Sequence, residues 1–222
     1  MTKVRRGTVV EQGVALLRNR ILRNELVPGT PVTEEAMAAA IGMSRPTVRE
    51  VLTTLVLQGL LTRNPKTRIL EVTTLSPDEV REIYRARTVL ELAGIEAAAT
   101  LDDDELRQLE STVDDMARAV AEADVEAMVD ADSRSHACTV GFLHSRYLSE
   151  LHADLMARLN LALNQVETSD SRDEAALVAL HREYCDLVLA RDTAAAQASL
   201  RARLSDAERE VLASTFVAST SR

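Results

Sequence analysis

The distribution of proline and glycine constrains the fold of this chain more than any other feature. All five prolines lie within the first 77 residues, and the only glycines beyond Pro77 are Gly94 and Gly141. Alanine, leucine, glutamate and arginine dominate this long stretch. Such a composition contains few of the residues that favour strands and tight turns. The sequence therefore predicts that residues 76–222 form an all-helical domain.

Apolar residues at helical spacing divide this C-terminal part into six amphipathic segments. Ser76 to Glu79 combines a capping box with proline in the first turn, which predicts the start of the first helix. We expect the six helices near residues 77–99, 103–122, 124–143, 146–167, 171–190 and 193–216. Six amphipathic helices of this length predict a helical bundle.

The first 75 residues predict a smaller domain that begins with three helices. They are expected over residues 8–26, over residues 33–41, and from Ser44 to Gly59. Thr33 and Ser44 are residue types that cap helix N-termini, and Gly42 supplies a left-handed residue at the end of the second helix. Two helices separated by the short turn Gly42-Met43 predict a helix-turn-helix.

A change of pattern after Gly59 predicts a short hairpin. Residues 60–63 and 68–72 are typical of strands, and Asn64 to Thr67 is typical of a turn. A basic hairpin at this position forms a wing. The predicted fold is therefore mainly α: a winged helix-turn-helix of three helices and a two-stranded wing in residues 1–75, and an all-α bundle in residues 76–222.

The chain carries a formal net charge of -9, but the charge is unevenly distributed. Residues 1–72 contain 11 lysines and arginines against 6 acidic residues, a net charge of +5, and the rest of the chain has a net charge of -14. A basic N-terminal part favours contact with nucleic-acid phosphates. Ordinary scatter of surface charge explains the same asymmetry, so charge alone leaves the function open.

The sequence contains no secretory signal and no uncharged apolar run of membrane-spanning length, which predicts a cytoplasmic protein. Its two cysteines, Cys138 and Cys185, lie far apart without CxxC spacing. Neither a disulfide framework nor a thiolate metal site is indicated. We expect both cysteines to be small buried apolar residues.

The residues that start the third helix are suited to reading DNA. Arg45 and Arg49 are four residues apart and share a helix face, and arginine can donate two hydrogen bonds to guanine. Thr47 can donate to a phosphate or contact a thymine methyl group. Lys66 and Arg68 add positive charge in the wing. An ordinary solvated helix face is the alternative if this segment is considered alone.

The N-terminal part closely resembles the winged-helix domain of the GntR family from Leu16 to Val72. The matching segments are Leu26–Gly29, Ile41–Arg45, Val48–Leu52 and Gln58–Leu60. The resemblance implies a homodimer that binds double-stranded operator DNA through paired recognition helices. The chain departs from the family in the order of Pro46 and Thr47 and in lacking the usual wing glycine, which predicts altered sequence preference and a differently shaped wing tip.

The C-terminal part is similar to the helical FCD effector domain of FadR-type regulators. The similarity is carried by Ile83 to Arg87, by Leu90-Glu91 and by the alanine run that ends at Ala99. It implies that this domain binds a small effector, and organic acids are common effectors of such regulators.

Asp132 and His136 have the i, i+4 spacing that lets two side chains on one helix bind the same ion. His181 lies in a later apolar helix pattern, consistent with a ring that faces the bundle interior. By spacing alone, a partly buried ion pair and a core histidine are the favoured explanation of these residues. The resemblance implies more, because Asp132, His136 and His181 match the first three ligands of metal-binding FCD domains, whose ion here would be zinc, nickel or manganese.

Arg203 occupies the position where the family has its last histidine ligand. A guanidinium stays protonated and cannot coordinate a cation, so we expect either a three-ligand metal site or no metal at all. Arg203, together with Arg87, is predicted to bind the carboxylate of the effector through bidentate hydrogen bonds. We expect His144 in a loop and His152 near a surface turn, both outside the site.

These observations favour a regulator that is not an enzyme, a repressor whose operator affinity is modulated by a small carboxylate. Two other functions would each explain part of the sequence. A helical metallohydrolase would use Asp132, His136 and His181 as a catalytic metal site, but it leaves the basic helix and wing without a role. A helical adaptor would bind proteins through its amphipathic faces and show no salt-dependent affinity for DNA.

Overall fold

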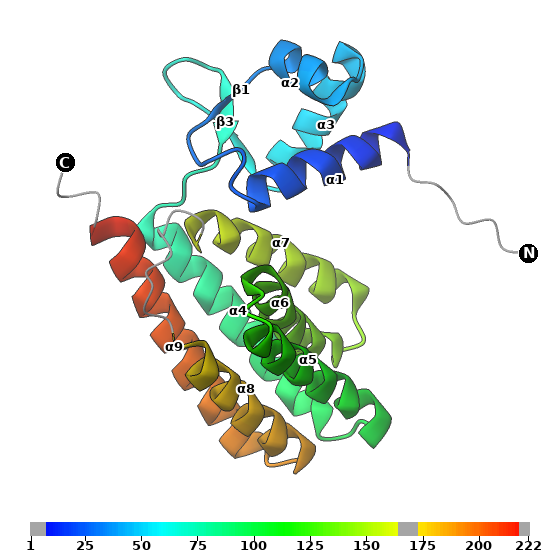
Figure 1. Cartoon of the computed structure of the whole chain (residues 1–222), viewed down its shortest axis with the longest axis vertical. Helices are drawn as coiled ribbons and strands as arrows, with labels where there is room; N and C mark the ends of the chain where they lie inside the picture. Colours follow the sequence, from blue (N-terminus) through cyan, green and yellow to red (C-terminus); the bar gives the residue numbers. More distant parts are fainter. Residues whose placement is uncertain (1–7, 164–172, 218–222) are drawn as a thin grey trace, which may run out of the picture. The chain divides into compact units, whose positions relative to one another are not determined.

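The computed structural model describes residues 8–163 and 173–217, and it is mainly α-helical, as predicted (Figure 1). The described residues form two compact units. The first comprises residues 8–76 with residues 157–163, and the second comprises residues 77–156 with residues 173–217. Within the described ranges, no helix is both long and apolar enough to cross a membrane. The helical expectations for residues 164–167 and 171–172 fall outside the described residues.

The first unit contains three complete helices, residues 157–163 at the end of a fourth helix, and a small antiparallel sheet of order β1-β3-β2. Its elements are α1 (Val9–Leu22), β1 (Pro31–Val32), α2 (Glu34–Ile41), α3 (Arg45–Leu57), β2 (Leu61–Arg63) and β3 (Leu70–Val72). The predicted two-stranded wing is formed by β2 and β3, and β1 adds a third strand that was not predicted. β1 consists of two residues and contains Pro31, so it lacks the alternating pattern of a strand. Its place at the sheet edge tolerates proline, which cannot donate a ladder hydrogen bond.

The first helix is shorter than the predicted 8–26, because the chain turns at Asn24. Asn24 has a left-handed φ of 58°, a conformation that asparagine tolerates and that cannot continue a right-handed helix. The backbone N–H groups of Glu25 and Leu26 both donate to the carbonyl of Arg20, at 2.9 and 3.1 Å, and close the end of α1.

The predicted helix caps are confirmed in this unit. The side chain of Thr33 accepts a hydrogen bond from the Ala36 backbone at 3.2 Å, and Ser44 caps α3 in the same way. Gly42 and Gly59 have left-handed φ angles of 67° and 74°. The helices and the sheet enclose a buried apolar core of Leu17, Ile21, Val32, Val48, Val51, Leu52, Leu55, Leu60, Leu61, Val72, Ala157 and Leu161, among others.

The turn of the wing forms without the family's glycine. The side-chain oxygen of Asn64 accepts hydrogen bonds from the backbone of Lys66 and Thr67, at 2.9 and 3.1 Å. Arg68 then takes the left-handed conformation, with a φ of 62°. Asparagine side chains stabilise such turns, so Asn64 organises this one. The left-handed position of the turn is occupied by Arg68.

The second unit is a six-helix bundle, as predicted. Its helices are α4 (Pro77–Ala98), α5 (Asp103–Ala121), α6 (Val125–Gly141), α7 (Arg146–Leu163), α8 (Glu174–Leu189) and α9 (Thr193–Val217). Only residues up to 156 of α7 belong to it. Helix α4 packs against α6 and α9, α5 packs against α6 and α8, and α8 packs against α9. Helix α8 is therefore connected to the pair of α4 and α6 through α5 and α9.

Gly94 lets α4 and α6 approach each other closely. A Cβ atom built at this position would lie 2.0 Å from the carbonyl oxygen of Thr139 on α6, a distance that no real contact allows. A glycine inside a helix ordinarily costs stability. Here the missing side chain permits the backbone of α6 to pack closely against α4. The polar residues of α6 are thereby brought next to α4.

Candidate DNA-binding surface and effector site

The sequence-predicted DNA-binding residues lie on two elements of the first unit. Arg45 is exposed in the first turn of α3. Thr47 is half-buried, and its hydroxyl lies 2.8 Å from that of Ser44, the helix cap. Lys66 and Arg68 are exposed in the turn between β2 and β3. Exposed cations at a helix N-terminus and on a wing are available to DNA phosphates and bases.

Arg49 is held by an acidic side chain that sequence reasoning missed. Its Nε and Nη2 atoms donate to the two carboxylate oxygens of Glu34 on α2, at 2.7 and 2.9 Å. This pair of hydrogen bonds raises the pKa of Arg49 and lowers that of Glu34. The edge of the guanidinium formed by these two nitrogens is therefore occupied, and the outer N–H groups remain for a phosphate.

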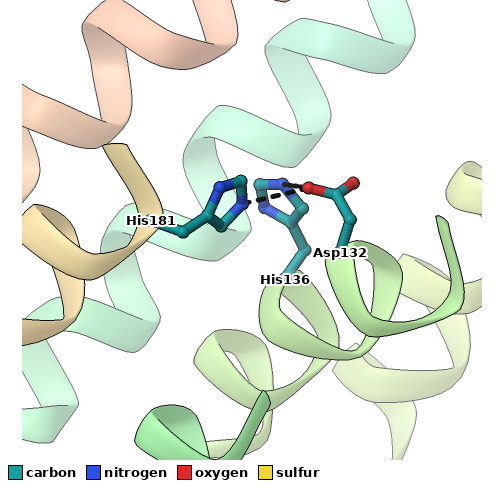
Figure 2. A group of neighbouring side chains, drawn as sticks. All are labelled: Asp132, His136 and His181. Carbon is teal, nitrogen blue, oxygen red and sulfur yellow. Dashed lines mark ion pairs between the residues drawn. The ribbon is translucent and has the colours of Figure 1, made fainter. Parts of the chain in front are cut away.

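In the second unit, Asp132, His136 and His181 lie together and form the Asp-His-His cluster (Figure 2). Asp132 and His136 project from α6 and His181 projects from α8. Oδ1 of Asp132 lies 3.9 Å from Nε2 of His136 and 3.0 Å from Nε2 of His181. Both histidines are buried, with 8% and 1% of their surfaces exposed, so the predicted inward orientation of His181 is confirmed.

The far nitrogen of each histidine is fixed by a hydrogen bond. Nδ1 of His181 donates to the backbone carbonyl of Leu177 at 2.9 Å. Nδ1 of His136 lies 2.6 Å from the carboxylate of Glu91 on α4. Burial lowers the pKa of His136 and favours its neutral form. Nε2 of both rings faces Asp132.

Glu91 is a fully buried carboxylate that the sequence analysis did not assign to the site. Its oxygens accept hydrogen bonds from Arg87 at 3.0 Å, from His136, and from His152 at 3.2 Å. Burial by itself would raise the pKa of Glu91, but its interactions with His136 and Arg87 outweigh burial and hold the pKa well below the usual value. The sequence feature that could have identified Glu91 is its i, i+4 spacing from Arg87 within an apolar helix face.

The expectation that His152 lies near a surface turn is wrong. His152 is 1% exposed, on α7, and it donates to Glu91. The prediction failed because the neighbouring pattern did not show which face of α7 packs inward. His144, by contrast, lies between α6 and α7, exposed and 2.8 Å from Glu105.

Cys185 is buried as expected, whereas Cys138 is only half-buried. Cys138 was expected to be buried, but it faces a groove between α5 and α6 that also contains Gly141 and Phe142. Burial raises the pKa of both thiols, to about 12 for Cys185 and about 11 for Cys138. Both are therefore unreactive thiols at neutral pH.

Arg203 extends from α9 into the same cluster. Its Nη2 contacts Nε2 of His181, and its guanidinium carbon lies 5.2 Å from the centre of the Tyr184 ring. The Tyr184 hydroxyl in turn lies 2.9 Å from that of Thr139. Burial lowers the pKa of Arg203, and the negative charge of Asp132 opposes that shift. Among the residues that the structure describes, Nε and Nη1 of Arg203 are buried and have no hydrogen-bond acceptor.

The cluster fits a metal ion only in part. The candidate ligand atoms of Asp132, His136 and His181 lie within 4.8 Å of one another, so these residues could hold an ion. Hydrogen bonds at Nδ1 are also what metal-ligating histidines make. Arg203 does not fit, because its guanidinium contacts Nε2 of His181, the atom that would bind the ion, and cannot itself act as a ligand.

Comparison with known proteins agrees with this division of the chain. The FCD domain family matches residues 82–206, and the gntR family of bacterial regulatory proteins matches residues 5–70. A similar relative is the uncharacterized HTH-type transcriptional regulator YdhC of Bacillus subtilis. It is 28% identical over 165 residues, which cover 72% of each chain. An HTH-type transcriptional regulator of Streptomyces ambofaciens is 29% identical over 195 residues, covering 85% of this chain and 78% of that one.

A solved structure also resembles this chain. A GntR transcriptional regulator from Rhodococcus sp. RHA1 has a TM-score of 0.80 and 25% identity, over 91% of this chain and 97% of that one. The family and the relatives do not support the metallohydrolase alternative. The chain therefore belongs to the GntR family of bacterial regulatory proteins, carries an FCD domain, and is a DNA-binding transcriptional regulator rather than an enzyme.

Proposed function

We propose that the protein is a homodimeric, cytoplasmic repressor that releases its operator when a small organic acid binds in the helical unit. The observation that carries this proposal is the buried guanidinium of Arg203, whose Nε and Nη1 atoms have no acceptor among the described residues. Leaving such donors unpaired in a buried site is costly. A carboxylate supplies both the missing acceptors and the opposite charge.

Arg203 is the anchor of the effector in this proposal, with no zinc, nickel or manganese ion required. Arg87 has a different role, because it is already paired with the buried Glu91. It supports the anchor indirectly by keeping Glu91 ionised, and Glu91 fixes His136 next to Asp132. Binding of an anion at Arg203 would therefore act on side chains from α4, α6 and α8 together.

On the DNA side, Arg45 is the proposed base-reading residue and Thr47 lies next to it in the same turn. Arg49 is proposed to contact a phosphate, because Glu34 occupies one edge of its guanidinium. Lys66 and Arg68 are proposed to contact the backbone through the wing. Two copies of this surface, related by a two-fold axis, would match a pseudo-palindromic operator.

The proposal can be tested with a DNA site selected by the purified full-length protein from a random pool. Fluorescence anisotropy measures the affinity for that site in the presence of acetate, lactate, gluconate, citrate or benzoate. We expect one of these acids to weaken DNA binding at least about tenfold, a typical coupling between two sites. The same acid should relieve repression of a reporter gene whose promoter contains the selected site.

Arg203→Gln is expected to bind the selected DNA as the wild type does, but to lose the response to the acid. One charge-assisted hydrogen-bonding partner is removed, which corresponds to about a tenfold or greater loss of effector affinity. Arg201→Gln, an exposed position on the same helix, is the matched control and should respond normally. An unchanged response in Arg203→Gln, or DNA binding that no acid affects, would contradict the proposed effector site.

A further inference from the structure

The Asp-His-His cluster already contains a cationic side chain. Nδ1 of His181 donates to the Leu177 carbonyl, and its Nε2 atom lies 3.0 Å from Oδ1 of Asp132. The Nη2 group of Arg203 contacts the same Nε2. The guanidinium therefore lies against the atom through which His181 would bind a metal ion.

The cluster also has positive charge nearby without a metal ion. Arg87 is paired with the buried Glu91, and Arg203 contacts His181. A divalent ion would add two positive charges next to a guanidinium that already contacts one of the ion's ligands. Repulsion between such charges is strong in a buried environment, where water screens little.

We propose that the guanidinium of Arg203 is the resident cation of the Asp-His-His cluster and takes the place of a divalent metal ion. The inference rests on the proposed function, because it specifies how that same site receives its anionic effector. Asp132 and His181 position the guanidinium, and the Tyr184 ring supports its face. Nε and Nη1 remain for the ligand, which is a small carboxylate bound directly to the protein without an intervening metal.

The test is the zinc content of untagged full-length protein after dialysis against zinc sulfate, measured by plasma mass spectrometry. Wild type is compared with Arg203→His, with the double variant Arg203→His/Asp132→Asn, and with the control Arg201→His. Replacing Arg203 by histidine creates one carboxylate and three imidazoles, a ligand set suited to zinc. We expect background zinc in wild type and in Arg201→His, and about tenfold more in Arg203→His, close to one ion per chain. In the double variant, the added Asp132→Asn substitution should remove this gain in zinc content.

Two results would overturn the inference. One is wild-type protein that binds close to one zinc ion per chain and loses it in the single variant Asp132→Asn. The other is an Arg203→His variant that is folded, as judged by circular dichroism and thermal unfolding, but gains no zinc. If Arg203→His does not fold, the comparison of wild type with Asp132→Asn decides alone: equal background zinc supports the inference, and Asp132-dependent zinc overturns it.

The zinc measurement contains neither DNA nor a carboxylate, so its result is independent of the proposed repression. A chain that excludes zinc but responds to no acid would contradict the proposed function and leave Arg203 as the resident cation. A chain that responds to an acid and also binds zinc through Asp132 would contradict only the inference.

Discussion

Glu91 on α4 connects side chains from three helices of the second unit: Arg87 on α4 itself, His136 on α6 and His152 on α7. Its carboxylate accepts hydrogen bonds from Arg87, His136 and His152, and none of it is exposed. We expect Glu91→Gln to destabilise the protein, because the buried guanidinium of Arg87 loses its counter-ion. Breaking a buried ion pair typically costs about 3 kcal/mol or more. Urea denaturation followed by circular dichroism would measure the change in the free energy of unfolding.

Glu82→Gln is the matched control for this prediction. Glu82 lies on the same helix and pairs with Arg85, but both side chains are largely exposed. Exposed ion pairs contribute little, so we expect a change within about 0.5 kcal/mol. If the two variants unfold at the same urea concentration, Glu91 is not the stabilising residue that its contacts indicate.

Helices α4 and α6 depend on the absence of a side chain at Gly94. We expect Gly94→Ala to lower the free energy of unfolding by about 2 kcal/mol, because the added Cβ collides with the backbone of Thr139 and forces the helices apart. Helix propensity alone predicts the opposite, a gain of about 1 kcal/mol. Thermal and urea unfolding of the full-length chain would distinguish the two expectations.

Gly141→Ala separates propensity from packing in the same experiment. Gly141 ends α6, and no atom lies within 4 Å of a Cβ built there. We therefore expect this variant to be as stable as the wild type or slightly more stable. Destabilisation by Gly141→Ala as large as that by Gly94→Ala would show that close packing of α4 against α6 is not the cause.

Considered as a whole molecule, the protein has a net charge of -9 but carries its excess positive charge in residues 1–72. We expect DNA affinity to fall steeply with salt concentration, because phosphate contacts release counterions. Lys66→Gln, which removes one exposed cation of the wing, should reduce the slope of log affinity against log salt by about one. Anisotropy titrations over a series of sodium chloride concentrations measure this slope.

Arg107→Gln changes the net charge by the same amount as Lys66→Gln, but at an exposed position on α5 of the acidic unit. It is expected to leave the slope unchanged, since only contacts with phosphates release counterions. Equal effects of the two substitutions would mean that the overall charge of the chain governs DNA binding, and not the wing.

Much of the fold could be predicted from the sequence because its signals are local. Thr33, Ser44 and Gly42 determine helix ends through hydrogen bonds and backbone angles within a few residues. The absence of proline after Pro77 leaves few alternatives to helices. The i, i+4 spacing of Asp132 and His136 likewise places both on one face of α6. These features follow from the chain itself, and the structure reproduces them.

Only the tertiary structure decided which distant residues meet. His152 and Glu91 are 61 positions apart and Arg203 and His181 are 22 apart, and helix packing brings each pair into contact. The periodicity of one helix does not predict which face of another helix it contacts, because the contact depends on how the whole core packs. The sequence alone therefore determined the helices, their caps and the candidate ligands, and the packing of those helices determined that Arg203 contacts His181 and that His152 contacts Glu91.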